Sequence, residues 1–483
     1  MDTIKKCQNL MLGIAIGDAF GAGYENLSRS EVQEALNMTQ YDCYPFESGH
    51  KPGHYTDDTQ MSIAVAKTLY GMCFDRRNLT HSFLEEYKSN NIIGYSRGFL
   101  SILEASKSPE DFINNVVHTE RNGAVMRAVP IGVLQDIKKV VENSVINAQI
   151  SHNTDSAITA SVAIALASHY FFYNLGQPSE VIEFCIDNMG GFNPESLEYL
   201  AEVSKMGELK PEILFGEENK DHGVPIHGLK TAGAVLYLLT RYSHDGMETL
   251  KQAVLLLGDT DTTSSIALGI VQSASEGGLD DFLQDDLQNG DYGKDYIRRI
   301  GTRLATILPM EVRSIKRLNY PGSRQSMIVQ TLDGLLEILD PIYLTQVMKQ
   351  LFDQIDYKPT DIILAVDASG YIPAVAASIV TGLKLGASKK ADLEISNRIE
   401  FYEPGTPNPN VFMYSIPDNS RVIIVDDEIM SGNTAYNAAK ALMENGHKVL
   451  ATVVPVESTR HNSREKLSSK GISLISHTKH DFS

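Results

Sequence analysis

The strongest constraint on the fold is a change of pattern near Pro309. Before it, apolar residues recur at three- and four-residue steps, as in 61–70, 157–170 and 231–239, and this spacing predicts helices. After residue 325, short β-rich runs alternate with helical segments. The stretch between is basic and polar and contains Pro321-Gly322, which is typical of a linker. The sequence therefore predicts an all-α domain at 1–311, a linker at 312–325 and an α/β domain at 326–483.

The second domain is predicted to hold a parallel sheet with crossover helices, because strand, turn and helix repeat along it. Pro, Gly and Asn are frequent in 403–410, which is expected to be a mobile loop. The predicted strands are 362–366, 422–425, 449–456 and 472–475, and the predicted helices are 373–385 and 434–444.

Charge and cysteine content narrow the expected partners and the compartment. The chain has 42 Lys+Arg against 61 Asp+Glu, a net charge of −19, which argues against nucleic acid because phosphate binding needs a basic surface. Its four cysteines form no CxxC pair, as expected for free thiols in a reducing compartment. The apolar stretch 10–16 faintly resembles a signal peptide, but Asp18 interrupts it. We expect a cytoplasmic protein without a membrane partner.

Acidic clusters are the first chemical signal. Thr56-Asp57-Asp58-Thr59 and Gly258-Asp259-Thr260-Asp261-Thr262 each open a predicted helix. Neighbouring carboxylates repel one another unless a cation neutralises them, and Asp and Thr oxygens suit Mg²⁺ or Mn²⁺. Two such clusters could face each other across a cleft and hold two ions. The alternative is that each cluster only caps its helix.

With three further segments, these clusters resemble the ADP-ribosylglycohydrolase family in order and spacing over roughly residues 8–300. The five segments are Gly17-Asp18-Ala19 with Glu25, Tyr55–Met61, Asn122–Pro130, Ser151-His152-Asn153, and Gly258–Thr262.

This resemblance implies a divalent-metal-dependent hydrolase that acts on glycosyl bonds and releases ADP-ribose from a protein or small molecule. The implied base that activates water is Asp58 or Glu25. The implied ligands of two Mg²⁺ ions, with Mn²⁺ as an alternative, are Thr56, Asp57, Asp58, Asp259, Asp261 and Thr262. The implied ADP-ribose contacts are Asn122, Gly123, Ala124, Val125 and Met126, whose backbone N–H groups would cradle the pyrophosphate, and His152.

A second signal lies in the α/β domain. The predicted strand 422–425 ends in Asp426-Asp427, at the edge where open α/β sheets bind ligands. Ser431-Gly432-Asn433-Thr434 then opens a helix, whose N–H groups suit a phosphate. This loop offers acceptors for a ribose diol and donors for a phosphate. The alternative is a strand-to-helix turn with an acidic rim.

The same string resembles the phosphoribosyl-pyrophosphate motif of type I phosphoribosyltransferases, over roughly residues 325–480. The implied ligand is phosphoribosyl pyrophosphate or a nucleoside monophosphate. Val366-Asp367-Ala368-Ser369-Gly370, after the earlier predicted strand, resembles the pyrophosphate loop of the same family. The implied contacts are Asp367, Ser369, Gly370, Asp426, Asp427, Met430, Ser431, Gly432, Asn433 and Thr434.

The second motif departs from that family in two ways. In the stretch 398–405, where the family presents basic residues to pyrophosphate, only Arg398 is basic, and Met430 replaces a small residue. Two interpretations follow: a hydrolase joined to a domain that binds phosphoribosyl pyrophosphate and can transfer phosphoribose, or a hydrolase regulated by a catalytically silent sensing domain. A third interpretation, a silent first domain, conflicts with its complete set of acidic residues.

Overall fold

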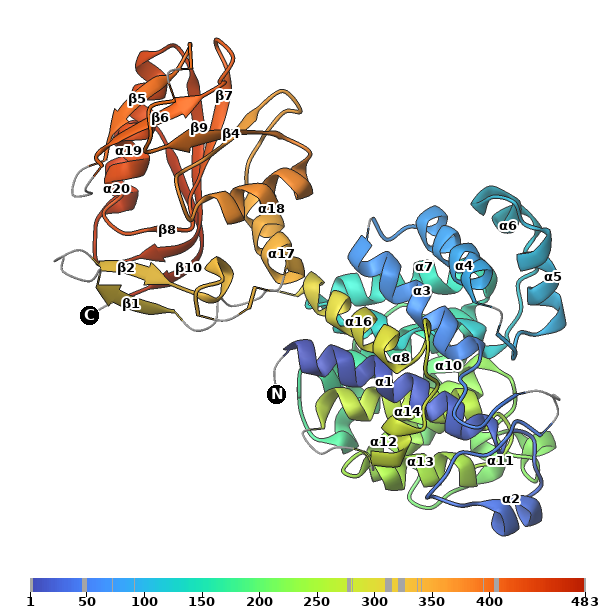
Figure 1. The fold of residues 1–483 in the computed structure, drawn as a ribbon. Coiled ribbons are helices and arrows are strands. Elements are labelled where there is room, and N and C mark those ends of the chain that lie inside the picture. Colours follow the sequence, from blue (N-terminus) through green and yellow to red (C-terminus); the bar gives the residue numbers. More distant parts are fainter. Residues whose placement is uncertain are drawn as a thin grey trace. The chain divides into compact units, whose positions relative to one another are not determined.

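The chain forms two compact units, Met1–Leu308 and Pro309–Ser483, which are described separately (Figure 1). The computed structural model describes residues 3–45, 50–71, 73–90, 92–275, 279, 281–308, 315–319, 326–336, 338–339, 341–393, 395–403 and 408–481. The domain boundaries predicted from the sequence, 1–311 and 326–483, remain a prediction.

The first unit is built from helices, as predicted. The helical segments predicted at 61–70, 157–170 and 231–239 lie within α3, α8 and α12. Its helices are α1 Thr3–Ala22, α2 Arg29–Ala35, α3 Asp57–Gly71, α4 Arg76–Ser89, α5 Arg97–Ala105, α6 Pro109–Asn115, α7 Ile137–Ser151, α8 Asp155–Phe172, α9 Val181–Asp187, α10 Pro194–Lys205, α11 Pro211–Leu214, α12 Gly228–Tyr242, α13 Gly246–Leu255, α14 Thr260–Ala274, α15 Asp281–Asp285 and α16 Lys294–Leu304. Helices α8 and α14 are buried around most of their circumference and form the centre of the core.

Helices α1 and α14 pack backbone against backbone. Gly13, Gly17 and Gly21 recur every four residues on α1 and therefore share one face. A methyl group on Gly13 would lie 2.8 Å from the Leu268 carbonyl oxygen, and one on Gly17 or Gly21 would overlap the backbone of α14. The absence of side chains thus lets the acidic residues of the two helices come close together.

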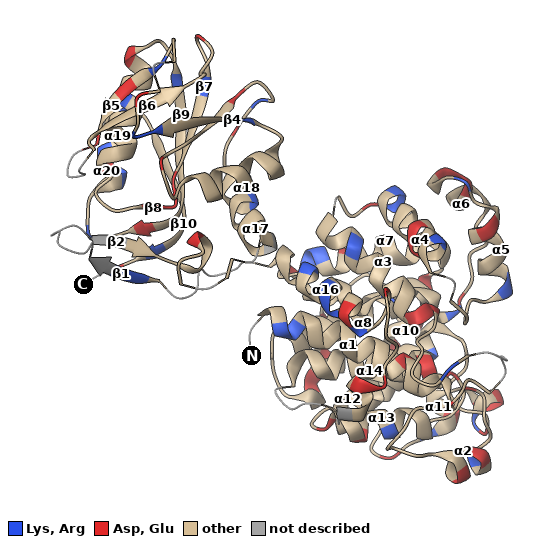
Figure 2. Cartoon of the chain, viewed as in Figure 1, with Lys and Arg blue, Asp and Glu red and all other residues tan. Residues whose placement is uncertain are grey.

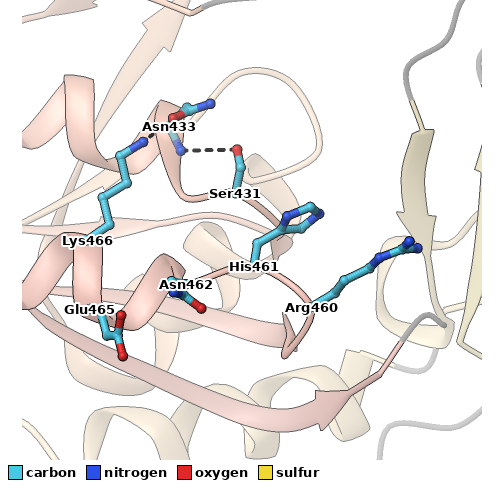
Figure 3. A pocket seen from close by; sticks show the side chains of 7 residues that line it. All are labelled: Ser431, Asn433, Arg460, His461, Asn462, Glu465 and Lys466. Atoms are coloured by element: carbon cyan, nitrogen blue, oxygen red, sulfur yellow. Dashed lines mark hydrogen bonds between the residues drawn. The ribbon is translucent and has the colours of Figure 1, made fainter.

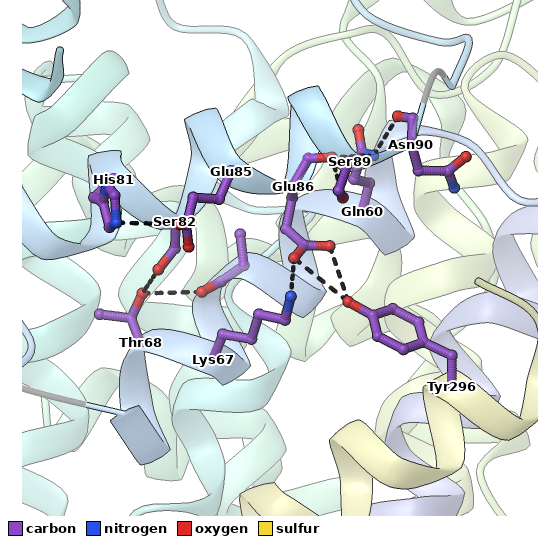
Figure 4. A network of polar contacts seen from close by, with 11 residues as sticks. Gln60, Lys67, Thr68, His81, Ser82, Glu85, Glu86, Ser89, Asn90 and Tyr296 are labelled. Carbon is purple, nitrogen blue, oxygen red and sulfur yellow. Dashed lines mark hydrogen bonds and ion pairs between the residues drawn. The ribbon is translucent and has the colours of Figure 1, made fainter. Parts of the chain in front are cut away.

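A polar network joins α3, α4 and α16 (Figure 4). Glu86 on α4 is almost fully buried and pairs with Lys67 of α3. The Tyr296 hydroxyl of α16 donates to Glu86 Oε2 at 3.2 Å. Gln60, near the start of α3, donates from its Nε2 atom to the backbone carbonyl oxygens of Glu86 at 2.9 Å and Asn90 at 2.8 Å. This network fixes the helix whose first residues are the acidic pair at 57–58.

Replacing Glu86 with alanine should lower the free energy of unfolding by about 2 kcal/mol, because the change leaves a half-buried tyrosine hydroxyl and a lysine without their buried acceptor. Glu85→Ala is the matched control, since Glu85 is exposed and forms an ion pair with His81 on the same helix. Urea denaturation of the two variants measures the difference. Equal midpoints would contradict the structural role of the network.

The second unit is an α/β domain with a mixed sheet (Figure 1). The strand order is β10-β9-β7-β3-β4-β6-β5, with β8 pairing β9. Neighbours from β10 to β4 are parallel, whereas β4–β6 and β6–β5 are antiparallel. The elements are β1 Lys316–Asn319, β2 Ser326–Val329, α17 Pro341–Phe352, β3 Ile362–Ala365, α18 Tyr371–Thr381, β4 Lys384–Lys389, β5 Ile399–Tyr402, β6 Asn410–Tyr414, β7 Arg421–Val425, β8 Glu428–Ile429, α19 Asn433–Glu444, β9 Lys448–Ser458, α20 Ser463–Ser468 and β10 Ser473–His480.

The predicted parallel core is confirmed, but three details differ from the prediction. The helix predicted at 373–385 ends at Thr381, because Gly382 adopts a left-handed conformation, and β4 follows. The hairpin of β5 and β6 was not predicted. Part of the predicted linker is ordered, since Lys316–Asn319 pairs antiparallel with Ser326–Val329. Residues 404–407 of the predicted mobile loop lie outside the described residues.

Charged residues of both signs are mixed on the outer helices of the first unit, such as α2, α4 and α5 (Figure 2). Among the described residues, no helix is both long and apolar enough to cross a membrane.

Candidate functional site

Asp18 organises the start of α3. This carboxylate is fully buried on α1 and accepts hydrogen bonds from the backbone N–H and hydroxyl of Thr56, at 3.0 and 2.8 Å. It also accepts from the backbone N–H and hydroxyl of Thr59, at 2.9 and 2.5 Å. Burial raises the pKa of Asp18, and these hydrogen bonds oppose the shift. Asp18 thus supplies from another helix the cap that the first turn of α3 needs.

The predicted acidic residues meet where α1, α3 and α14 come together. One carboxylate oxygen each of Glu25, Asp259 and Asp261 lie within 4.8 Å of one another, and all three residues are buried. Thr262 donates its hydroxyl to Asp58 Oδ2 at 3.3 Å, which joins the start of α14 to that of α3. The other oxygen of Asp58, Oδ1, is buried without a hydrogen-bond partner among the described residues.

Burial and mutual repulsion together keep these carboxyl groups from ionising easily. Burial is the largest cause, and it raises the pKa of Asp259 to about 6. Burial and then the charge of Asp261 raise the pKa of Glu25 to about 8. The pKa values of Asp57, Asp58 and Asp261 lie well above the ordinary range, first through burial and then through neighbouring acids.

Within the described residues, the acidic cluster has no basic partner at ion-pair distance. The largest charge effects on Asp58 come from Asp261, Asp18, Asp57 and Asp259, all acidic, although the buried Arg127 acts on Asp57 from farther away. No ion pair among the described residues includes any of these carboxylates. Buried charges normally require a partner. An all-oxygen set of buried acids with one orphaned oxygen atom fits a hard divalent cation.

The loop predicted to hold ADP-ribose contacts this acidic cluster. Asn122 donates its side-chain amide to Asp259 Oδ2. However, the backbone N–H groups of Val125 and Met126 donate to the Asn122 carbonyl oxygen, at 2.8 and 3.0 Å. The expectation that the whole segment cradles pyrophosphate with its backbone is therefore wrong for these two residues, because hydrogen bonds within the segment itself use their donors. Ala124 and Val125 are completely buried.

A buried arginine orients His152. Arg127 donates to Asn147 Oδ1 at 2.7 Å and to the Ser151 hydroxyl at 2.8 Å, and Ser151 Oγ lies 2.8 Å from His152 Nδ1. Burial, and then the charge of Arg127, lower the pKa of His152 to about 3, so the ring is neutral. We assign the ring proton to Nε2, so that the Ser151 hydroxyl, which accepts from Arg127, donates to Nδ1.

The side chain of His152 lies against Gly123. A methyl group on Gly123 would be 2.7 Å from His152 Cε1 and 3.0 Å from Nε2. Gly123→Ala should therefore displace the imidazole and raise KM for an ADP-ribosylated substrate by about tenfold, an effect of roughly 1.4 kcal/mol. Gly98→Ala is the control, because that methyl group would meet nothing within 4 Å. Steady-state kinetics compare the variants, and an unchanged KM for Gly123→Ala would place His152 outside the substrate site.

In the second unit, Asp426 and Asp427 follow β7 at the carboxyl edge of the parallel strands. A methyl group on Gly370 would be 2.9 Å from Asp426 Oδ1, so the turn after β3, which contains Asp367, Ser369 and Gly370, lies next to Asp426. Burial raises the pKa values of both acids, and the charge of Asp427 adds to the shift at Asp426.

The predicted phosphate turn opens α19. Gly432 has a φ of 68°, which favours glycine, and the Asn433 N–H donates to Ser431 Oγ at 3.4 Å. Thr434 donates its hydroxyl to Glu403 Oε1 at 3.1 Å. Met430 is half-buried just before the turn.

Two lysines near this turn were not predicted. Lys390 Nζ pairs with Glu403 Oε2 at 2.8 Å, and Lys389 Nζ lies 3.9 Å from Asp367 Oδ1. The expected basic residue Arg398 instead pairs with Asp392 at 2.8 Å. Lys389 ends β4 and Lys390 follows it; because the prediction missed this strand, their position could not be foreseen.

Comparisons with known proteins agree with this organisation. The family model for ADP-ribosylglycohydrolase matches residues 1–305, well over half of the chain, and the model for the phosphoribosyl transferase domain matches residues 337–481. These matches confirm the predicted fusion.

Curated relatives are similar to one unit or the other. The ADP-ribosylhydrolase ARH3 of Mus musculus is 23% identical over 309 residues, covering 55% of this chain and 82% of that protein. The hypoxanthine/guanine phosphoribosyltransferase of Methanosalsum zhilinae is 27% identical over 144 residues, covering 30% of this chain and 73% of that protein.

Among solved structures, a chain described as an ADP-ribosylglycohydrolase-related protein complex is 20% identical and covers 63% of this chain and 98% of its own length, with a TM-score of 0.49. The match of the family model to the helical unit decides the assignment: the chain belongs to the ADP-ribosylglycohydrolase family and carries a phosphoribosyl transferase domain after its helical unit.

Proposed function

We propose that the first unit is a divalent-metal-dependent hydrolase that releases ADP-ribose from an ADP-ribosylated protein or small molecule. One observation carries this proposal: buried carboxylates converge from α1, α3 and α14 without a basic partner among the described residues, and Asp58 Oδ1 has no hydrogen-bond partner there. Such an arrangement is costly unless a cation completes it.

The cation, Mg²⁺ or Mn²⁺, would be held by oxygen atoms from the starts of α3 and α14. When bound, it lowers the pKa of a water and polarises the ribose oxygens. The proposed ligands are Thr56, Asp57, Asp58, Asp259, Asp261 and Thr262.

The residues around the cation complete the proposed reaction. Asp58 or Glu25 accepts one proton of the attacking water, whose oxygen bonds to C1″ as the bond from C1″ to the acceptor breaks; the carboxyl group then gives this proton to the leaving acceptor. His152, held as the Nε2–H form, offers a donor to the substrate beside Gly123. The backbone N–H groups of Gly123 and Ala124 are the proposed pyrophosphate donors.

For the second unit, we propose binding of phosphoribosyl pyrophosphate or a nucleoside monophosphate. Asp426 and Asp427 would accept from the ribose diol, and the turn at 431–434 would hold the 5-phosphate. The ion pair of Lys390 with Glu403 favours a sensing domain over a transferase. It neutralises the charge of Lys390, which a transferase would use to bind the departing pyrophosphate.

Full-length protein, dialysed against EDTA, should lose release of ADP-ribose from labelled ADP-ribosylated proteins and recover it with Mg²⁺ or Mn²⁺. Chromatography of free ADP-ribose is the readout. Full activity in excess EDTA would contradict metal dependence. A separate assay measures pyrophosphate release from phosphoribosyl pyrophosphate in the presence of a panel of bases. Release with one of the bases indicates a transferase, whereas binding without release indicates a sensing domain.

A further inference from the structure

The predicted phosphate turn, which runs from Ser431 to Thr434, borders a pocket of about 690 Å³ (Figure 3). Ser431 and Asn433 line this pocket, and Lys466 of α20 donates to Asn433 Oδ1. Thr434 is not among the described residues that line it. A ligand thus finds space beside the first part of the turn, whereas the hydroxyl of its last residue already has an acidic partner.

That acidic partner is Glu403, which follows β5. Its Oε1 atom accepts a hydrogen bond from the Thr434 hydroxyl at 3.1 Å, and its Oε2 atom pairs with Lys390 Nζ at 2.8 Å. The Glu403 side chain is only 15% exposed. A negative charge is therefore already held at the N-terminus of α19, where the helix dipole favours an anion.

Two further contacts place Glu403 at this position. Its backbone N–H donates to the carbonyl oxygen of Pro409 at 2.6 Å, just before β6. Asn437 of α19 donates its side-chain amide to the carbonyl oxygen of Tyr402 at 2.6 Å. The end of β5 is thereby held against α19, and the carboxylate that follows it is directed to the first turn of that helix.

The carboxylate of Glu403 and a bound phosphate need the same donor. A threonine hydroxyl has one hydrogen, so Thr434 can donate either to Glu403 or to a phosphate oxygen. A phosphate beside the carboxylate would also bring two like charges together at a partly buried position, where water screens them less than in bulk solvent. Both effects require Glu403 to leave Thr434 when a phosphate binds there.

We propose that Glu403 is a built-in competitor of the ligand. In the ligand-free protein its carboxylate occupies the place of the 5-phosphate at Thr434, and the ligand must displace it. This inference rests on the function proposed for the second unit and concerns the regulation of that site. Because the ligand replaces an internal anion and not only water, a ribose without a phosphate would leave Glu403 in place.

Titration calorimetry of GMP into the full-length protein with Mg²⁺ tests the proposal. Glu403→Ala should bind GMP about tenfold more tightly than the unaltered protein, because the phosphate no longer displaces a charge-assisted hydrogen bond. Glu403→Gln keeps a neutral acceptor of the same shape and should give a smaller gain, about threefold. Glu400→Ala is the matched control, since this exposed acid lies on β5 itself, and its GMP affinity should stay within about twofold of that of the unaltered protein.

Combining Glu403→Ala with Lys390→Ala separates competition from net charge. The double variant loses one charge of each sign, so its net charge equals that of the unaltered protein. It should still bind GMP about fivefold more tightly than the unaltered protein, because Thr434 no longer donates to a carboxylate. A return to the affinity of the unaltered protein would show that only net charge matters and would overturn the inference.

Equal or weaker GMP binding by Glu403→Ala would also overturn the inference and leave the proposed function standing, because Glu403 would then be a permanent part of the turn. Binding by Glu403→Ala alone, with no heat in the unaltered protein, would support the inference. No heat with GMP, AMP or phosphoribosyl pyrophosphate in either protein would refute both the inference and the function proposed for the second unit.

Discussion

Asp261→Asn should lower kcat/KM for release of ADP-ribose by about 10³-fold, because the substitution removes one charge from the cluster that would hold the cation. The carboxylate of Asp261 lies with those of Glu25 and Asp259, and asparagine keeps its size and its acceptor oxygen. Metal affinity, measured by titration of the metal-free protein, should fall in parallel by about 10–100-fold.

The same substitution should have the opposite effect on stability without metal. Removing one of several buried, mutually repelling acids should raise the free energy of unfolding of the metal-free protein by about 1 kcal/mol. Thermal unfolding in EDTA and in Mg²⁺ separates the two effects. Asp221→Asn, at an exposed acid in a loop of the same unit, should change neither activity nor stability. An active, metal-responsive Asp261→Asn protein would rule out this residue as a ligand.

The acidic cluster also sets the pH dependence of the metal-free protein. The pKa of Glu25 rises from 4.5 to about 8 and that of Asp259 from 3.8 to about 6 on folding, so the folded state binds protons more tightly than the unfolded state. The contribution of these two protonated carboxyl groups to stability is therefore fully present below about pH 4 and is lost as the pH rises through about 6 and then 8. Because a bound cation stabilises the ionised forms, Mg²⁺ should flatten this slope.

Replacing both Asp426 and Asp427 with asparagine should weaken binding of phosphoribosyl pyrophosphate to the second unit by about 10²-fold, because each neutral amide accepts more weakly than a carboxylate from the ribose diol. Hydrolysis by the first unit should stay within about twofold of the unaltered protein, since the variants lie outside its acidic cluster. Calorimetry and ADP-ribose release measure the two effects on the same preparation.

Asp418→Asn provides the control for this pair, because Asp418 is exposed before β7, at the opposite end of that strand. It should leave binding unchanged. If the double variant binds phosphoribosyl pyrophosphate as tightly as the unaltered protein, the acidic pair is a structural rim and the second unit uses other residues.

The acidic residues could be predicted because consecutive carboxylates at helix starts are rare and chemically specific. Asp57 and Asp58 begin α3, Asp261 lies in the first turn of α14, and Asp426 follows β7, all as the local patterns indicated. Such features depend on neighbouring residues in the chain, so the sequence carries them directly.

Contacts between distant segments could not be predicted in this way. Asp18 caps a helix that begins 39 residues later, and Arg127 supports His152 through Ser151. The one feature of the sequence that could have indicated this contact is the arginine inside the apolar stretch 124–133, since a buried guanidinium needs several acceptors. The 3₁₀ turn after Asn122 depends on backbone geometry that residue types alone do not specify.

The glycine face of α1 determines more than how closely two helices pack. Glu25 follows α1, while Asp259 and Asp261 begin α14, and Gly17 and Gly21 hold these helices at backbone contact. Oxygen atoms lie about 2.0–2.1 Å from Mg²⁺ and about 2.3–2.6 Å from Ca²⁺, so in the proposed metal site the spacing of the two helices would decide which ionic radius fits. Evolutionary selection for a cation of a given size would then act on glycines that never touch the ion.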